Sequence, residues 1–167
     1  MPAFLRIASI RKRVNFIDLI IYNRMKIRKA HVSDCTAIQA LLRQLGYPDT
    51  EQFLLTKLER MLTDPGEVML VYELDSKVVA FISVHFIPQI ALQGDFARIS
   101  YFAVMDETRG KGIGAEMEKY ITTLAKEKNC DRIEVHCHSR RSDAHRFYLR
   151  HGFKEAPKYF IKPLSAE

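Results

Sequence analysis

Three glycines within residues 110–114 place the strongest constraint on the fold of this chain. They stand between an apolar run at residues 96–105, which is typical of a β-strand, and a helical pattern at residues 112–128. A turn of this kind leaves backbone N–H groups uncovered at a helix N-terminus, where unpaired donors and the helix dipole favour an anion. Arg109 and Lys111 add positive charge, so the turn predicts a site for a diphosphate.

Two other phosphate-binding loops fit this stretch less well. A Walker loop requires the pattern GxxxxGK[ST], which the chain lacks. The dinucleotide pattern GxGxx[GA] is met by Gly110, Gly112 and Ala115, but it also requires an acidic residue at the end of the next strand. That predicted strand, residues 132–138, ends in His-Cys-His instead. A purely structural turn stays open as an alternative at this point.

The basic charge of the chain is concentrated at its N-terminus. The 167 residues carry 26 Lys and Arg against 20 Asp and Glu, a net charge of +6, which invites nucleic acid or a membrane surface as partner. Residues 1–24 contribute +4 of this, and the remaining 143 residues carry only +2. No aromatic residues interleave with the basic stretch at 140–146, and no run reaches the roughly 18 apolar residues of a membrane span. We therefore expect neither nucleic acid nor a membrane as partner.

The chain reads as one domain with an extension in front of it. We expect residues 1–24 to be an N-terminal extension of unknown role and residues 25–167 to form a single domain. Cys35, Cys130 and Cys137 are odd in number and form no CxxC pair. A disulfide framework is therefore not expected, and a cytoplasmic location fits better.

Periodicity and turn signals predict the element order β-α-α-β-β-β-α-β-α-β. Ser33 and Thr50 are predicted to cap the first two helices, and Asp75-Ser76 is predicted to turn a hairpin. The hairpin implies antiparallel pairs, whereas strand–helix–strand alternation in the second half implies parallel neighbours. We therefore predict an α/β three-layer sandwich with a mixed sheet. The predicted strands are residues 25–29, 68–74, 77–87, 96–105, 132–138 and 153–161, and the last helix is 141–151.

Two motifs resemble the GNAT superfamily of N-acetyltransferases. Arg109–Gly114 fits the acetyl-CoA motif [QR]xxGx[GA] of that superfamily, and Phe102–Val104 matches the apolar-x-Val pattern that precedes it. The resemblance extends over residues 25–163, although Arg141 stands where the family often has Asn. The closing pattern Asn-x-x-Ala-x-x-Phe-Tyr-x-x-x-Gly-Phe is otherwise met by Ala144, Phe147, Tyr148, Gly152 and Phe153.

The resemblance implies a mostly antiparallel sheet flanked by helices and direct transfer of an acetyl group from acetyl-CoA to a primary amine of a small molecule. It implies no metal, and a homodimer is compatible with it. A non-catalytic acyl-CoA-binding sensor and acetylation of a protein amine are alternatives. The residues expected to bind acetyl-CoA are Phe102, Ala103, Val104, Arg109, Gly110, Lys111, Gly112, Ile113, Gly114, Ala115, Arg141, Ala144 and Phe147.

The resemblance also implies catalytic roles. Tyr148 occupies the position of the general acid, whose phenol would protonate the departing thiolate. A backbone N–H where the strands ending near Val104 and His138 diverge would stabilise the oxyanion. The polar residues of 132–138 alternate with apolar ones and share one strand face, which makes Glu134 or His138 the candidate base. A structural hydrogen-bond network is the alternative for these polar residues.

Overall fold

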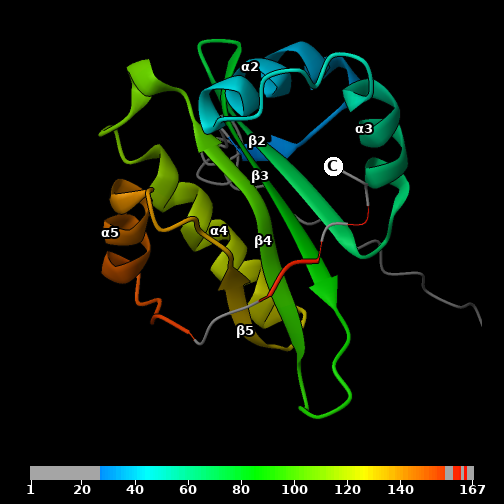
Figure 1. The fold of residues 1–167 in the computed structure, drawn as a ribbon, viewed down its shortest axis with the longest axis vertical. Helices are drawn as coiled ribbons and strands as arrows, with labels where there is room; N and C mark the ends of the chain where they lie inside the picture. Colours follow the sequence, from blue (N-terminus) through cyan, green and yellow to red (C-terminus); the bar gives the residue numbers. More distant parts are fainter. Residues whose placement is uncertain (1–26, 157–159, 163, 165–167) are drawn as a thin grey trace, which may run out of the picture.

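The computed structural model describes residues 27–156, 160–162 and 164, so the predicted extension lies outside the described residues. A five-stranded sheet runs in the order β1-β2-β3-β4-β5 through the middle of the molecule (Figure 1). β1 to β4 pair antiparallel, and β4 and β5 pair parallel. The strands are β1 (Ile27–Lys29), β2 (Glu67–Leu74), β3 (Lys77–Ile87), β4 (Asp95–Val104) and β5 (Cys130–Val135).

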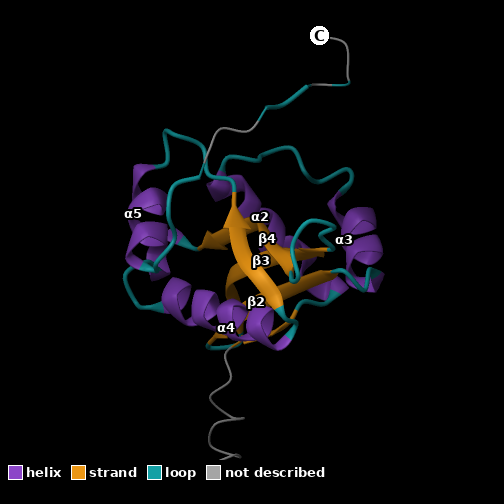
Figure 2. Ribbon diagram, turned by 90° about the horizontal axis from the view of Figure 1, so that it is seen from below, coloured by secondary structure: helices purple, strands orange, loops and turns teal. Residues whose placement is uncertain are grey.

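Helices cover both faces of this sheet. Helices α2 and α3 pack against β2, β3 and β4 on one face, and α4 packs against β3, β4 and β5 on the other. Figure 2 shows the sheet between these helices, with α5 beside α4. The predicted three-layer sandwich with a mixed, mostly antiparallel sheet is confirmed. The helices are α2 (Cys35–Leu45), α3 (Leu54–Thr63), α4 (Ile113–Glu127) and α5 (Ser142–Arg150), with short 3-10 helices η1 (Val32–Asp34) and η2 (Asp106–Thr108).

Each face of the sheet has its own hydrophobic core, because successive residues of a strand point to opposite sides. On β3, Phe81 packs with Leu41 and Leu58 under α2 and α3, whereas Ile82 packs with Met117 under α4. All five side chains are no more than 2% exposed. The helical and strand periodicities in the sequence therefore correspond to two separate buried layers.

Strand β4 extends beyond its parallel partner. It pairs with β3 as far as Val104, but its last pair with β5 is Ile99 opposite Val135. A bulge at Ser100 shifts the β3–β4 register at this point, since Ser83 lies opposite Tyr101 and Val84 opposite Ile99. Beyond Ile99 the edge of β4 that faced β5 is therefore open, and this opening lies at the end of the sheet where α4 begins.

Two predicted strands differ from the structure. Residues 136–138 lie outside β5, which ends at Val135 because β4 offers no further pairing beyond its bulge. The second is the strand predicted at residues 153–161. Its described residues, 153–156 and 160–161, form no strand, since β propensity alone does not supply a pairing partner.

The predicted helix caps also need correction. Ser33 lies inside η1, and the first turn is held by Asp34, which accepts a hydrogen bond from the His31 N–H at 2.8 Å. Thr50 accepts from the N–H groups of Phe53 and Leu54 through its backbone carbonyl, not its side chain. The backbone alone therefore begins α3, one turn later than the sequence suggests.

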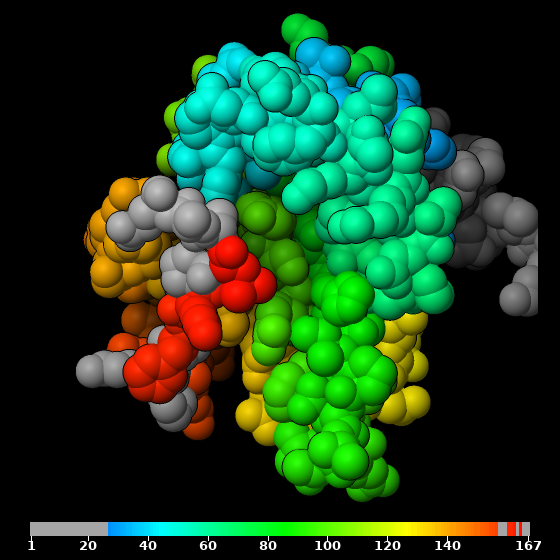
Figure 3. Space-filling model, turned by 45° about the vertical axis from the view of Figure 1, so that its right-hand side comes forward, coloured from blue at the N-terminus to red at the C-terminus, as the bar shows by residue number. Residues whose placement is uncertain are grey.

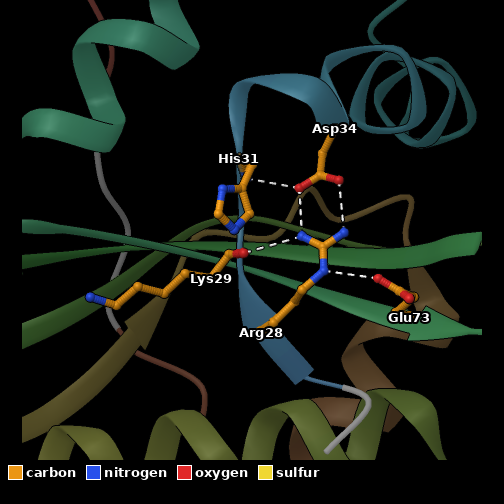
Figure 4. Close-up of polar contacts among 5 residues, drawn as sticks. All are labelled: Arg28, Lys29, His31, Asp34 and Glu73. Carbon is orange, nitrogen blue, oxygen red and sulfur yellow. Dashed lines mark hydrogen bonds and ion pairs between the residues drawn. The ribbon is translucent and has the colours of Figure 1, made fainter. Parts of the chain in front are cut away.

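Arg28 connects the short edge strand β1 to the neighbouring elements through side-chain hydrogen bonds (Figure 4). Its guanidinium donates two hydrogen bonds to Asp34, at 2.8 and 2.9 Å, and one to Glu73 of β2 at 2.9 Å. The Asp34 side chain is only 7% exposed, and the Arg28 guanidinium holds the pKa of this carboxyl below its usual value. A charged cluster thus joins β1, η1 and β2.

Candidate active site

A cavity of about 610 Å³ lies between the open end of β4, the N-terminus of α4 and helix α5. The chain brings together here nearly all the residues expected to bind acetyl-CoA, together with the expected general acid. Lys111 is the exception, because it does not line the cavity. The predicted residues in its wall are Phe102, Ala103, Val104, Arg109, Gly110, Gly112, Ile113, Gly114, Ala115, Arg141, Ala144, Phe147 and Tyr148.

Part of the cavity wall comes from residues that the sequence motifs do not indicate. Gln44, at the end of α2, accepts a hydrogen bond from the Asp106 N–H at 3.2 Å. This contact connects α2 to the loop before α4. No local pattern points to Gln44, because it comes from a distant element, but helical spacing from Phe147 could have indicated His151. The residues that the prediction missed are Gln44, Leu45, Thr108, Arg140, Ser142, Asp143, Arg150 and His151.

The glycine turn presents backbone donors to the cavity. Gly110 and Gly112 have φ values of 78° and 83°, which side chains other than glycine rarely adopt. Gly112 is the N-cap of α4, and its carbonyl accepts the first helical hydrogen bond from Glu116 at 3.0 Å. The N–H groups of the first turn of a helix lack intrahelical partners and point outward along the helix axis. This end of the cavity therefore favours an anion.

Of the two cations in the turn, only Arg109 faces the cavity. Its guanidinium forms an ion pair with Asp106 at 2.8 Å and also donates to the Val104 carbonyl at 3.4 Å. Asp106 therefore offsets part of the positive charge that Arg109 brings to this end of the cavity.

Helix α5 is fixed against α4 by close contacts. A Cβ built on Gly114 would lie 3.2 Å from the Phe147 ring, so the absence of a side chain lets this ring approach α4. The Phe147 ring also packs on Phe102 of β4, with centroids 5.9 Å apart. His151 Nδ1 lies 3.3 Å from the nearly buried Glu118 carboxylate of α4. These contacts set the position of Tyr148, the next residue after Phe147.

The Tyr148 ring lies between two aromatic neighbours, with centroid distances of 5.4 Å to Phe147 and 5.2 Å to Phe153. Burial raises the pKa of the Tyr148 phenol above its ordinary value, and nearby Cys137 adds to this rise while Arg141 opposes it. The phenol therefore stays protonated at neutral pH. It can donate a proton or hydrogen bond in the cavity.

The two candidate bases are not part of this cavity. Glu134 of β5 is held by Arg98 of β4, with 3.0 Å between Oε2 and Nη2. His138 lies in the turn after β5, where its Nδ1 accepts from the Arg140 N–H at 3.2 Å. The predicted common strand face for Glu134 and His138 is therefore wrong, because the strand ends before His138. Among the described residues, no three His, Cys, Asp or Glu side chains cluster as metal ligands would.

Comparisons with known proteins agree with this geometry. A family model described as the acetyltransferase (GNAT) family matches residues 34–153. The chain is 26% identical over 140 residues to an aminoalkylphosphonate N-acetyltransferase of Salmonella typhimurium (strain LT2), covering 83% of this chain and 91% of that one.

Solved structures share the fold. A putative acetyltransferase from Agrobacterium tumefaciens has a TM-score of 0.74 at 23% identity, covering 82% of this chain and 98% of that one. Glucosamine-6-phosphate N-acetyltransferase from Arabidopsis thaliana has a TM-score of 0.73 at 22% identity, covering 84% and 98%. Because the family model spans most of the sequence, the chain belongs to the acetyltransferase (GNAT) family and is an N-acetyltransferase.

No helix in the described part of the chain is long and apolar enough to cross a membrane.

Proposed function

We propose that this enzyme, within residues 25–167, transfers an acetyl group directly from acetyl-CoA to a primary amine of a small molecule. One observation carries the proposal. A single cavity joins an anion-favouring helix N-terminus, an open strand edge and a protonated tyrosine. These three features match the diphosphate, the amide-containing arm and the sulfur of one extended thioester.

The open edge of β4 is suited to the middle of such a substrate. Phe102–Val104 have backbone groups on the side where β5 no longer pairs, so an amide-bearing arm can add to the sheet as an extra strand. The diphosphate would lie at the glycine turn, beside Arg109. Arg140 and Arg141 at the start of α5 supply further positive charge to the same cavity.

Tyr148 is the proposed general acid. As the C–S bond breaks, its O–H donates a proton to the departing sulfur. Because burial raises the pKa of the phenol, the group still carries this proton at neutral pH. A backbone N–H where β4 and β5 separate, just after Ile99, would stabilise the negative charge that develops on the acetyl oxygen.

The acceptor would approach from the face covered by α2 and α3. Tyr47, between these helices, packs edge-to-face on Tyr101 of β4 with centroids 5.4 Å apart. Both rings are partly exposed and can attract a cationic amine through their faces. The Salmonella relative is named for an aminoalkylphosphonate, so a small amine carrying an anionic group is the first acceptor class to test.

We also propose a cytoplasmic location, which is supported by the free thiols of Cys35, Cys130 and Cys137. The possible homodimer stays a prediction.

An acceptor panel tests the proposed function. Free-thiol release from acetyl-CoA would be followed with aminoalkylphosphonates, amino sugars, polyamines and peptides with free N-termini. We expect saturable turnover with at least one small amine. Turnover with peptides alone would replace the small molecule by a protein amine, and tight acetyl-CoA binding without any turnover would favour the sensor.

A further inference from the structure

Four charged or titratable side chains lie in one straight line across the sheet. Glu67 of β2 is opposite His85 of β3, His85 is opposite Arg98 of β4, and Arg98 is opposite Glu134 of β5. Directly opposed residues project from the same face of a sheet. We call this set the cross-sheet row.

The cross-sheet row projects from the face on which α2 and α3 lie. The neighbours of His85 and Arg98 along their strands, such as Val84 and Ile99, are buried against α4, so the row itself points the other way. Figure 3 shows this face, where α2 and α3 cover the upper part, residues 160–162 and 164 lie beside the middle, and green atoms of β3, β4 and the loop between them are visible below. His85 and Arg98, whose side chains are 41% and 38% exposed, are therefore accessible from the side proposed for the acceptor.

Glu67 and His85 form a hydrogen-bonded pair within the row. His85 Nδ1 lies 3.0 Å from Glu67 Oε2, and the Ser83 hydroxyl donates to Glu67 Oε1 at 2.5 Å. The Glu67 side chain is only 5% exposed, whereas that of His85 is 41% exposed. A carboxylate that accepts Nδ1–H leaves the lone pair on Nε2 of the same ring. The buried Glu67 carboxylate therefore orients the exposed His85 ring.

The other charged groups near His85 are less suited to accept a proton, because each is either a cation or already bound to another group. Glu134 is paired with Arg98 at 3.0 Å, and Arg98 itself is a cation. Asp64, at the end of α3, lies near the ring, since a Cβ on Gly66 would be 3.2 Å from Asp64 Oδ1 and 3.3 Å from His85 Cε1. Asp64 accepts a hydrogen bond from the Gly66 N–H at 2.8 Å. His85 is thus the exposed and oriented base candidate of this face.

We propose that His85, held by Glu67, is the general base that accepts the proton of the acceptor amine. The inference rests on the proposed function, because it places the acetyl carbon where β4 and β5 separate. Arg98, the β4 partner of His85, directly precedes the last residue that pairs with β5. None of the four residues of the row lines the cavity itself, and Arg98 lies one residue along β4 from the proposed point of transfer.

The step balances without another reactant. The amine nitrogen forms a C–N bond with the acetyl carbon, and one N–H proton moves to His85 Nε2. The C–S bond breaks, its electron pair leaves on sulfur, and sulfur takes the Tyr148 proton. The imidazolium, paired with Glu67, then returns its proton through solvent to the Tyr148 oxygen, so that free thiol and amide are the only products.

The first test replaces His85. In H85Q we expect kcat to fall at least ~100-fold, which is the usual contribution of a general base, with unchanged affinity for acetyl-CoA. His31 is an exposed histidine before η1, outside the cavity and the row, and the matched control H31Q should retain turnover within about twofold. In H85A, added imidazole should restore part of the lost turnover, which a purely structural histidine would not allow.

Glu67 has a positioning role, and its test separates kcat from KM. In E67Q the maximal rate should fall roughly tenfold, because the ring is less well oriented, while the KM values for acetyl-CoA and for the acceptor should stay within about twofold. The conservative variant E67D keeps a carboxylate and should recover part of the lost rate. Equal rates in E67D and E67Q, or KM values that rise together with the loss of rate, would reduce Glu67 to a structural residue and overturn the pairing.

The outcomes separate this inference from the proposed function. A wild-type enzyme without thiol release for any amine refutes the proposed function, whatever the variants do. An active wild type with normal turnover in H85Q, or with no imidazole rescue of H85A, overturns the role of His85. A large loss in E134Q together with a small one in H85Q would move the base to Glu134.

Discussion

The Phe147 ring of α5 lies against Gly114 in the first turn of α4, so closely that a Cβ on Gly114 would be 3.2 Å from the ring. This contact joins the glycine turn to the helix that carries Tyr148. One packing contact therefore links the anion-favouring and proton-donating parts of the cavity.

Replacing Gly114 tests this link. In Gly114→Val the branched side chain pushes the Phe147 ring away from α4, so we expect affinity for acetyl-CoA to fall about tenfold (~1.4 kcal/mol). Gly114→Ala should have a smaller effect, because the ring needs to move by only a few tenths of an ångström. Calorimetric titration of both variants measures the difference, and equal affinities for Val and wild type would show that the contact is dispensable.

Arg109 and Lys111 form a matched pair of cations, of which only Arg109 faces the cavity. We expect Arg109→Ala to weaken acetyl-CoA binding by about 2 kcal/mol, as loss of a charge-assisted hydrogen bond does, and Lys111→Ala to have little effect. Asp106→Asn should tighten binding, since it removes the carboxylate that offsets Arg109 at 2.8 Å. Dissociation constants at two salt concentrations check all three, and a stronger effect for Lys111 would contradict this geometry.

Tyr148→Phe separates proton donation from binding. We expect kcat to fall roughly 100-fold, because the leaving thiolate loses its proton donor, while the dissociation constant for acetyl-CoA stays the same. Since burial raises the pKa of Tyr148, wild-type turnover should not decline through ionisation of this group up to about pH 10. Steady-state rates over this pH range are the measurement, and undiminished turnover in the variant would remove Tyr148 from the mechanism.

The Arg28–Asp34 cluster predicts a pH-dependent stability. Arg28 lowers the pKa of Asp34 in the folded state, so its stabilising contribution is present above the ordinary carboxyl pKa and is lost as the pH falls through the lowered value. At neutral pH, Asp34→Asn should lower the free energy of unfolding by about 2 kcal/mol, allowing for the partial exposure of Arg28.

Urea unfolding at neutral pH and near pH 3 checks this prediction, with a smaller difference expected at the lower pH. The exposed pair between Arg43 and Glu51 supplies the control, and Glu51→Gln should leave stability unchanged. An equal loss of stability in Asp34→Asn at both pH values would contradict the charge-based role.

Features encoded by nearby residues could be predicted from the sequence. The Asp75-Ser76 turn was predicted correctly, and the structure gives both residues positive φ, 50° and 60°, as a tight hairpin requires. The glycine turn and the cavity wall around Phe147 could also be predicted from the sequence, because each is formed by a motif that is continuous along the chain. Within each motif, the spacing of the residues follows the periodicity of the helix that carries them.

Features that depend on pairing between distant strands could not be predicted. The end of β5 at Val135 follows from the bulge at Ser100 on another strand, which no local pattern in β5 reveals. The pairing of the four residues in the cross-sheet row could not be predicted for the same reason. Glu67 and His85 are 18 residues apart and meet only because β2 and β3 pair in one particular register.

Direct acetyl transfer is the central claim, and a stoichiometric measurement tests it most directly. Free thiol and acetylated amine would be quantified in the same reaction, with acetyl-CoA and the best acceptor of the panel. We predict equal amounts of both products, and neither product when the acceptor or the enzyme is omitted. Thiol release without an amine, or binding of acetyl-CoA without either product, would contradict the account.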